Sequence, residues 1–269
     1  MLKLIVTDMD GTLLNSKGEM PKRAIPLIKK LREKGVKFAV ASGRQYHNLA
    51  NLYEEVKDDI IFIADNGGAV FDGEMNILHA GIPRDELKRL TEIFGAFDGA
   101  RPTYRTGDTA YFFKGDFDDA LRKEATGFYA GVNVVGNVDE IPEDVLITSM
   151  SVNHPDGVEE TIYNHVQHLQ NQYKITMGNA RWLDLTNANV NKGNAVKMLQ
   201  EKYDIAHEET MVFGDYLNDF EMMSTAYYSY AMENAHPDLK RVSTFTAPSN
   251  DEEGVIKIIE NFLSMAFRD

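Results

Sequence analysis

The chain has 269 residues, enough for about two ordinary domains, and its 42 acidic against 28 basic side chains give a formal net charge of −14. A chain with this much negative charge repels the phosphate backbones of nucleic acids and anionic lipids. We therefore expect neither nucleic acid nor a membrane as partner. The absence of cysteine excludes disulfides and thiolate chemistry, which leaves any metal to oxygen or imidazole ligands. No stretch approaches the ~18 apolar residues of a membrane span, and the first apolar run ends too early for a signal peptide. We therefore expect a cytoplasmic protein.

Short apolar runs alternate with amphipathic segments through the first part of the chain. The runs 2–7, 36–41 and 60–64 predict strands, and the segments 21–35 and 45–56 predict helices. Alternation of this kind is typical of a parallel sheet built from right-handed crossovers, with helices on both faces.

The same alternation returns near the end of the chain. The predicted helices there are 191–203, 217–223 and 251–267, and the predicted strands are 210–213, 226–232 and 242–246. We therefore expect the two chain ends to form one α/β domain around a doubly wound, Rossmann-like parallel sheet.

The composition changes over residues 82–186, between these two halves. Runs rich in Thr, Tyr, Phe and Val alternate there with segments of helical spacing, which are 84–94, 116–128 and 157–170. We interpret 82–186 as a separate α+β domain, inserted into a core that consists of 1–81 and 187–269.

Two aspartates directly follow the first predicted strand, in the run Asp8-Met9-Asp10-Gly11-Thr12. Open parallel sheets place their ligand sites at this end of their strands. Side chains two positions apart on an extended chain point the same way, so both carboxylates can face one crevice. With a glycine that lets backbone N–H groups turn inward, such a pair suits a divalent cation and a phosphoryl group. Taken alone, such a pair more often begins a solvated loop.

Polar residues at other element ends favour the functional interpretation. The runs 42–44 (Ser-Gly-Arg), 65–67 (Asp-Asn-Gly) and 214–219 (Gly-Asp-Tyr-Leu-Asn-Asp) follow three more predicted strands, and Lys192 begins the helix before the last of them. A hydroxyl, an ammonium group and two acidic clusters are therefore expected at one edge of one sheet.

The ordered runs DMDGT, SGR, DNGG, NKG and GDYLND resemble those of the haloacid dehalogenase-like phosphatase superfamily. The insertion resembles the α/β cap of its Cof-type branch, and the segments 234–240 and 249–255 look like C-terminal segments of that branch. The resemblance implies a Mg²⁺-dependent phosphatase that acts on a small phosphorylated metabolite, such as a sugar phosphate, a nucleotide or a phosphorylated cofactor. It also implies that the core determines the reaction and the cap determines the substrate.

Carried over position by position, the resemblance implies a role for each matching residue. Asp8 would be the nucleophile and Asp10 the general acid and base. The implied phosphate ligands are Ser42, Lys192, the Asn218 amide and the backbone N–H groups of Met9 and Gly43. The implied Mg²⁺ ligands are the Asp8 carboxylate, the Asp10 backbone carbonyl and the Asp215 carboxylate. Further candidates are Asp219, to orient water or Lys192, and Arg44 and Asn66, to contact substrate.

The implied reaction needs positive charge beside the nucleophile and two carboxyl groups with different pKa values. A phosphate ester dianion repels a carboxylate, so positive charge from Mg²⁺ and Lys192 must be present before Asp8 can attack. The attack forms an aspartyl-phosphate and divides one difficult step into two. Asp10 must first donate a proton and later accept one, so we expect it to carry a proton that Asp8 lacks, through surroundings that separate the pKa values of the two carboxyl groups.

Two other functions would use similar residues. A phosphomutase forms the same aspartyl-phosphate but returns the phosphoryl group to its substrate, and the sequence does not distinguish it from a phosphatase. A non-catalytic regulator also groups aspartates, a hydroxyl and a lysine around Mg²⁺. Asp10 argues against the regulator, because a domain that keeps its phosphoryl group needs no second carboxylate to activate water.

Three further groups have a functional and a structural interpretation, and for each we expect the structural one. His165 and His168 have the spacing of metal ligands but lie beside apolar residues, as on a helix surface. Tyr227, Tyr228 and Tyr230 could stack on a ligand or pack within a sheet. The third group lies in the inserted domain and could contact substrate: Arg101, Arg105, Arg181 and Trp182.

Overall fold

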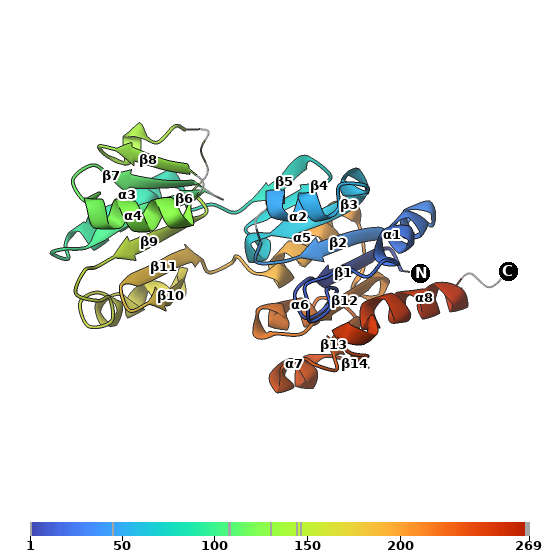
Figure 1. The fold of residues 1–269 in the computed structure, drawn as a ribbon. Helices are drawn as coiled ribbons and strands as arrows, with labels where there is room; N and C mark the ends of the chain where they lie inside the picture. The colour runs from blue at the N-terminus through green and yellow to red at the C-terminus, as the bar shows by residue number, and fades with distance from the viewer. Residues whose placement is uncertain are drawn as a thin grey trace. The chain divides into compact units, whose positions relative to one another are not determined.

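The computed structural model describes residues 2–44, 46–106, 109–129, 131–143, 145 and 147–266. The chain forms two compact units, one made of Met1–Leu78 with Val190–Asp269 and the other of His79–Asn189. In Figure 1 the blue N-terminal and red C-terminal segments belong to the same unit. None of the described helices is long and apolar enough to cross a bilayer.

The first unit is built on an eight-stranded sheet. In sheet order its strands are β14 (Phe245–Ala247), β13 (Tyr228–Met232), β12 (Thr210–Gly214), β1 (Leu4–Asp8), β2 (Lys37–Ala41), β3 (Ile60–Ala64), β4 (Ala69–Asp72) and β5 (Met75–His79). The strands from β14 to β3 are parallel, and β4 is antiparallel to β3. Every residue of β1 and β3 is buried, which explains why these strands are nearly uninterrupted apolar runs. The α/β fold predicted from the sequence is confirmed.

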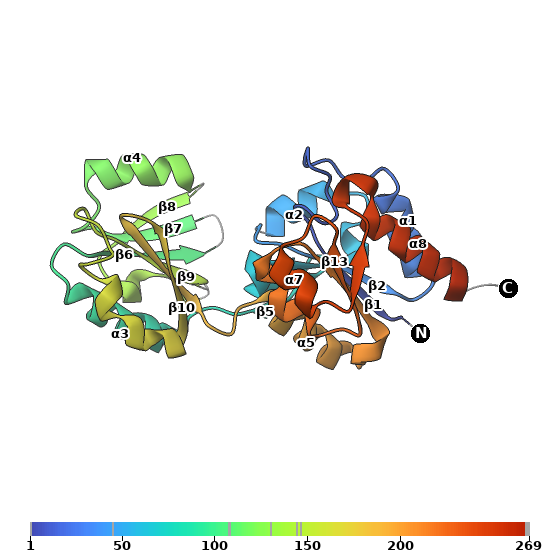
Figure 2. The ribbon, with the colours of Figure 1, turned by 90° about the horizontal axis from the view of Figure 1, so that it is seen from below.

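Helices cover both faces of this sheet. They are α1 (Ala24–Glu33), α2 (Tyr46–Leu52), α5 (Lys192–Tyr203), α6 (Phe220–Met223), α7 (Pro237–Val242) and α8 (Gly254–Ala266). Figure 2 shows α1 and α8 on one side of the sheet and α5 on the other, where α6 contacts both α5 and α7. Connections from β1 through α1 and from β12 through α6 run in opposite directions along the sheet, so right-handed crossovers place them on opposite faces. The order reverses between β1 and β12, and open sheets bind ligands at such a point.

The second unit contains a six-stranded sheet. In sheet order its strands are β10 (Tyr173–Asn179), β11 (Trp182–Asn187), β9 (Ser149–Asn153), β6 (Arg101–Thr106), β7 (Thr109–Phe113) and β8 (Gly131–Val135). Figure 2 shows α3 (Arg84–Gly95) and α4 (Asp119–Phe128) on opposite sides of this sheet. Alternate residues of β7 pack on opposite sides of the sheet. Tyr111 belongs to the apolar cluster with α3, whereas Ala110 and Phe112 belong to the cluster with α4.

The segment 157–170 differs from the prediction. It forms turns and the 3₁₀-helices Tyr163–His165 and Gln167–Asn171 instead of an α-helix. Val158 and Ile162 are buried, as the helical spacing of the apolar residues required. Its backbone hydrogen bonds change in spacing along the segment, from Ile162 to Val158 at 3.1 Å to His165 to Ile162 at 2.9 Å, so no regular α-helical repeat is kept.

The C-terminal elements also differ in their bounds. A strand was expected from Val242, but that residue ends α7, a six-residue helix that begins at Pro237, and β14 starts only at Phe245. Proline is favoured in a first helical turn, but a helix of this length shows no periodicity in the sequence. The predicted helix 251–267 begins at Gly254, and its last residue lies outside the described residues, as does Gln45 before α2.

Candidate active site

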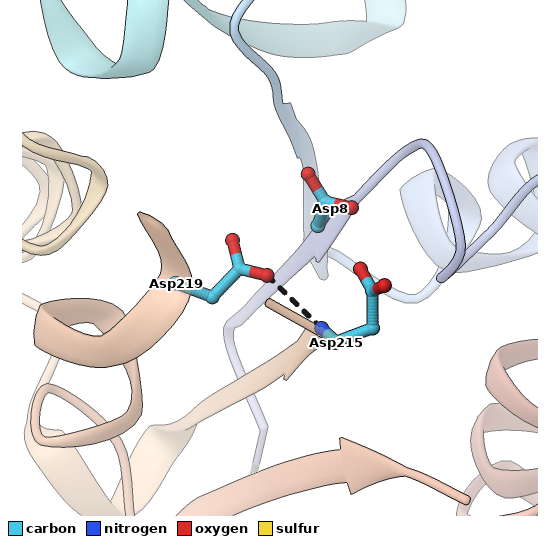
Figure 3. Close-up of side chains that lie close together, drawn as sticks. All are labelled: Asp8, Asp215 and Asp219. Carbon is cyan, nitrogen blue, oxygen red and sulfur yellow. Dashed lines mark hydrogen bonds between the residues drawn. The ribbon is translucent and has the colours of Figure 1, made fainter. Parts of the chain in front are cut away.

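Three aspartates and a lysine meet where the sheet order reverses. Asp8, the last residue of β1, and Lys192, the first residue of α5, are both buried. The Lys192 Nζ donates hydrogen bonds to Asp8 Oδ1 at 2.5 Å and to Asp219 Oδ1 at 2.6 Å. One carboxylate oxygen from each of Asp8, Asp215 and Asp219 lies within 4.8 Å of the others, and Figure 3 shows the three side chains pointing toward one another.

Burial controls the ionisation of this cluster. Burial and the charge of Asp219 raise the pKa of Asp8 from 3.8 to about 7, although Lys192 acts in the opposite direction. Burial also raises the pKa of Asp215, against the hydrogen bond from Thr12. Burial alone would lower the pKa of Lys192, but the charges of Asp8 and Asp219 outweigh it and hold that pKa above its ordinary value. The raised pKa of Asp8 is opposite to the expectation that Asp8 lacks a proton, and a further positive charge at the cluster would favour its ionised form.

Two glycines provide the space that the carboxylates occupy. A Cβ at Gly11, whose φ is +81°, would lie 2.4 Å from Asp215 Oδ2, and a Cβ at Gly214 would lie 2.6 Å from Asp219 Oδ2. Thr12 Oγ1 donates to Asp215 Oδ1 at 2.9 Å, and Asp219 Oδ2 accepts from the backbone N–H of Asp215 at 3.0 Å (Figure 3). The aspartates are therefore held in place by the loops that carry them.

Asp10 has a different partner. Its Oδ2 accepts from Arg44 Nε at 3.0 Å and its Oδ1 accepts from Arg44 Nη2 at 2.5 Å. Both side chains are accessible, with exposed fractions of 57% for Asp10 and 36% for Arg44. Two parallel hydrogen bonds fix the orientation of a carboxylate, so Arg44 holds the Asp10 side chain in one position.

The loops that follow β2, β3 and β12 are joined by hydrogen bonds. Ser42 is buried, its Oγ accepts from the Arg44 N–H at 3.2 Å, and its carbonyl accepts from the Asn66 N–H at 2.9 Å. Asn218 Nδ2 donates to Asn66 Oδ1 at 3.1 Å, and a Cβ at Gly43 would lie 3.1 Å from Asn66 Nδ2. Ser42, Gly43 and Asn218, three expected phosphate ligands, thus form one connected group through Asn66.

Met9 and the start of α5 are fixed by the core. The Met9 side chain is fully buried, and its Sδ accepts from the Tyr53 hydroxyl at 3.0 Å. A Cβ at Gly67, whose φ is +98°, would lie 2.4 Å from the Asn191 carbonyl oxygen, so the loop after β3 packs directly on the start of α5. The Asn191 side chain caps α5 by accepting a backbone N–H at 2.8 Å, which fixes the position of Lys192.

A set of hydrogen bonds from the C-terminal region was not expected from the sequence. Asn234 Nδ2 donates to the Gly11 carbonyl at 2.8 Å, and Asn234 Oδ1 accepts from the Asn250 N–H at 3.1 Å. Asn250 Nδ2 in turn donates to the Leu14 carbonyl at 2.9 Å. The available signal was that both asparagines lie in segments that resemble the Cof-type branch. Thr12 was also missed, although it belongs to the same run as the two N-terminal aspartates.

The remaining candidates have structural surroundings. His165 and His168 are exposed, and among the described residues only the aspartate cluster groups three or more acidic or histidine side chains closely enough for a metal. Tyr230 stacks on Phe213 and on Phe245, each with ring centroids 5.1 Å apart. In the second unit, each of the three arginines has an ion pair: Arg101 with Asp118 at 2.8 Å, Arg105 with Asp184 at 3.5 Å and Arg181 with Glu124 at 3.5 Å.

The relatives of this chain, which has a doubly wound sheet with an acidic site at its switch point, identify it as a phosphoric monoester hydrolase. Residues 5–259 match the haloacid dehalogenase-like hydrolase family, and the chain belongs to this family, in its Cof-type branch. A 5-amino-6-(5-phospho-D-ribitylamino)uracil phosphatase of Escherichia coli K12 is 30% identical over 265 residues, which cover 97% of this chain and 96% of that protein. A phosphatase of the same description from Bacillus subtilis 168 is 24% identical over 273 residues, which cover 97% and 98%. A crystal structure of a protein from Eubacterium rectale matches with a TM-score of 0.80 at 26% identity, covering 97% and 99%.

Proposed function

We propose that the protein is a Mg²⁺-dependent phosphatase that hydrolyses phosphate monoesters of small metabolites through an aspartyl-phosphate. The observation that carries this proposal is the hydrogen bond from buried Lys192 to Asp8 inside the aspartate cluster. A carboxylate can attack a phosphate dianion only where positive charge offsets the repulsion, and Lys192 supplies such a charge in direct contact with Asp8.

The relatives supply the first compound to test. The Escherichia coli and Bacillus subtilis proteins described above are phosphatases of 5-amino-6-(5-phospho-D-ribitylamino)uracil. We infer a substrate of this class for the present chain, in which the phosphate is carried by a polyol attached to a heterocyclic ring.

Each residue of the site has a task in this reaction. Asp8 attacks phosphorus, so that a new bond from its carboxylate oxygen to phosphorus forms as the bond to the leaving oxygen breaks. Asp10 gives its proton to the leaving oxygen and then takes a proton from the water that attacks the aspartyl-phosphate. Both Asp10 oxygens accept from Arg44, so Asp10 must leave Arg44 and take up a proton from solvent before it can protonate the leaving oxygen. In the second step the water oxygen bonds to phosphorus as the bond from phosphorus to Asp8 breaks, which releases phosphate and restores the Asp8 carboxylate. The phosphate oxygens would be held by Ser42, Lys192, Asn218 and the N–H groups of Met9 and Gly43.

The aspartate cluster fits Mg²⁺. Hard divalent cations prefer carboxylate and carbonyl oxygens, and the Asp8 and Asp215 carboxylates with the Asp10 carbonyl would hold the ion. Burial raises the pKa values of Asp8 and Asp215, which is the condition that a cation beside them would relieve. Bound Mg²⁺ would neutralise charge on the transferring phosphoryl group. Asp219 is engaged by Lys192 and by the backbone of Asp215, so it would position those groups.

We also propose a division of labour between the units. The unit His79–Asn189, or 82–186 by the boundaries expected from the sequence, would select the substrate, and the unit with the aspartate cluster would perform the reaction. Support comes from the location of all the proposed reacting residues, which belong to the first unit.

Phosphate release tests the proposed function. The purified protein is incubated with 5-amino-6-(5-phospho-D-ribitylamino)uracil or with an aryl phosphate, in Mg²⁺ or in EDTA. We expect release only with Mg²⁺, and none from Asp8→Asn protein whose circular dichroism is unchanged. Asp58→Asn, which makes the same charge change at an exposed position, should behave as wild type. Near-wild-type turnover by Asp8→Asn, in a preparation free of contaminating phosphatase, would show that Asp8 is not the nucleophile.

A further inference from the structure

The second unit contains a cavity of about 570 Å³ on the sheet face that α4 partly covers. Residues of β6, β9, β10 and β11 form its floor, and Glu124 and Ala125 of α4 form one side. The described polar and aromatic side chains that line it are Arg105, Glu124, Tyr129, Ser151, Asn179, Trp182 and Asp184.

Strand alternation makes the part of this face over β9 and β11 polar, whereas Ala110 and Phe112 of β7 pack against α4. On β11, Leu183 and Leu185 are buried in the apolar cluster with α3, whereas Asp184 between them lines the cavity. On β9, Met150 belongs to the same apolar cluster and the adjacent Ser151 lines the cavity. An antiparallel sheet can leave such a polar face to water, but here the polar side chains line a cavity together with the Trp182 ring, which suits a ligand.

Hydrogen bonds fix the orientation of the polar side chains that line the cavity. Ser151 Oγ donates to Asp184 Oδ1 at 2.5 Å, and Arg105 Nε donates to Ser149 Oγ at 2.9 Å. The Arg105 Nη1 to Asp184 Oδ1 distance is 3.5 Å, which is long for such a pair. Arg105 Nη1 also donates to Ser151 Oγ at 3.4 Å, and the guanidinium group has a hydrogen bond with Tyr129. A guanidinium has five N–H donors and a carboxylate has about four acceptor positions, so both groups still keep capacity for a ligand. Gly178 leaves room for the carboxylate, because a Cβ there would lie 2.9 Å from Asp184 Oδ2.

Trp182 gives the cavity a flat, fixed wall. Its Nε1 donates to Glu124 Oε1 at 2.7 Å, and its ring packs against the apolar cluster of α4. Asn179 Oδ1 accepts from the Arg181 N–H at 2.8 Å, which orients the amide so that Nδ2 is its donor group. The cavity thus presents an aromatic ring face together with alternating hydrogen-bond donors and acceptors.

The charges of the cavity argue against an anionic ligand. Among the described lining residues, Arg105 is positive and both Glu124 and Asp184 are negative. Arg105 also lies within reach of Asp184, so its charge is partly neutralised. Glu124 is paired with Arg181 at 3.5 Å, so the cavity offers a phosphate no uncompensated positive charge, whereas an uncharged ring with polar edges needs none.

We propose that this cavity binds an uncharged, planar pyrimidinedione ring. One edge of such a ring presents an N–H between two carbonyl oxygens. Asp184 accepts from the N–H, Arg105 and Asn179 donate to the carbonyl oxygens, and Trp182 lies against the ring face. The choice of a pyrimidinedione rests on the proposed function, because the substrate inferred there contains one, whereas the polar edge and aromatic wall are features of the cavity itself.

Tryptophan fluorescence tests the proposal directly. Trp182 is the only tryptophan of the chain, so its emission reports on this cavity. The full-length protein is titrated in EDTA with 5-aminouracil up to about 1 mM, and with ribitol in parallel. We expect saturable quenching by 5-aminouracil and none by ribitol. Absence of a saturable change, or a response to ribitol alone, would overturn the proposal.

Two variants with a matched control locate the binding. Gly178→Ala places a methyl group against Asp184 at an exposed strand position, and Asp184→Ala removes the acceptor. We expect each to weaken 5-aminouracil binding about tenfold or more. Gly115→Ala is the control, because a Cβ there has nothing within 4 Å. Wild-type affinity in both folded test variants would place the ring elsewhere.

A competition experiment shows whether the bound ring is part of the substrate or a separate ligand. If the ring belongs to the substrate, 5-aminouracil competes with 5-amino-6-(5-phospho-D-ribitylamino)uracil for turnover, and if it is a separate ligand the inhibition is not competitive. Either pattern, together with quenching, supports the cavity as the binding site. The fluorescence titration needs no turnover and can use Asp8→Asn protein, so a failure of the proposed phosphatase reaction and a failure of this inference give different results.

Discussion

The Lys192 ammonium group contacts the buried carboxylates of both Asp8 and Asp219, which would repel each other without it. We expect Lys192→Ala to lower kcat roughly a hundredfold or more, because the charge beside Asp8 is lost. The free energy of unfolding should fall by about 3–5 kcal/mol, since Asp8 and Asp219 lose their buried partner. Phosphate release and urea unfolding measure the two effects. Lys197→Ala, at an exposed position of the same helix, is the control and should change neither.

The raised pKa of Asp8 predicts an unusual dependence of stability on pH in EDTA. The folded protein holds this proton up to a pKa of about 7, whereas the unfolded chain releases it near 3.8. The folded state therefore binds more protons between these values, and the free energy of unfolding falls as the pH rises from about 4 to about 7. Asp8→Asn should flatten this decline in part, because the raised pKa of Asp215 acts in the same direction. Equal slopes for wild type and variant in urea unfolding would contradict the assignment.

The loop after β1 requires glycine at position 11 for two reasons that can be separated. Gly11 and Gly18 both have positive φ, +81° and +76°, but only a Cβ at Gly11 meets another group, Asp215 Oδ2 at 2.4 Å, whereas Gly18 has nothing within 4 Å. Alanine at either position should cost about 1 kcal/mol of stability through backbone strain. Only Gly11→Ala should also raise the Mg²⁺ concentration needed for phosphate release. Equal Mg²⁺ titrations of the two variants would exclude a part for Asp215 in metal binding.

The elements around the site could be predicted because their signals are local. The buried strands β1 and β3 are apolar runs that end at Asp8 and just before Asp65, so the sheet edge that carries the polar residues followed from the sequence. The partner of Asp10 could not be predicted, because Arg44 lies 34 positions away and the contact depends on the register of β1 and β2. The hydrogen bond from Asn234 to the Gly11 carbonyl spans 223 positions and could not be predicted for the same reason.

At the scale of the whole molecule, the site depends on chain ends that are brought together by the sheet. Asp8 and Lys192 are 184 positions apart, and the inserted unit accounts for most of that separation. The two units have separate sheets and separate apolar clusters. The chain can therefore be shortened at the boundary without removing a strand of the first sheet.

Removal of the inserted unit should separate reaction from recognition. A protein in which residues 1–81 are joined by a short flexible linker to 190–269 keeps every strand of the first sheet and all the proposed reacting residues. We expect it to bind Mg²⁺ and to hydrolyse an aryl phosphate slowly, because the aspartate cluster remains. It should lose its preference among phosphorylated metabolites, because remote contacts that position a substrate are gone. Circular dichroism and the Asp8→Asn form of the shortened protein serve as controls, and release is compared across a panel of metabolites. If the folded, shortened protein ranked them as the full chain does, specificity would reside in core residues such as Arg44 and Asn66.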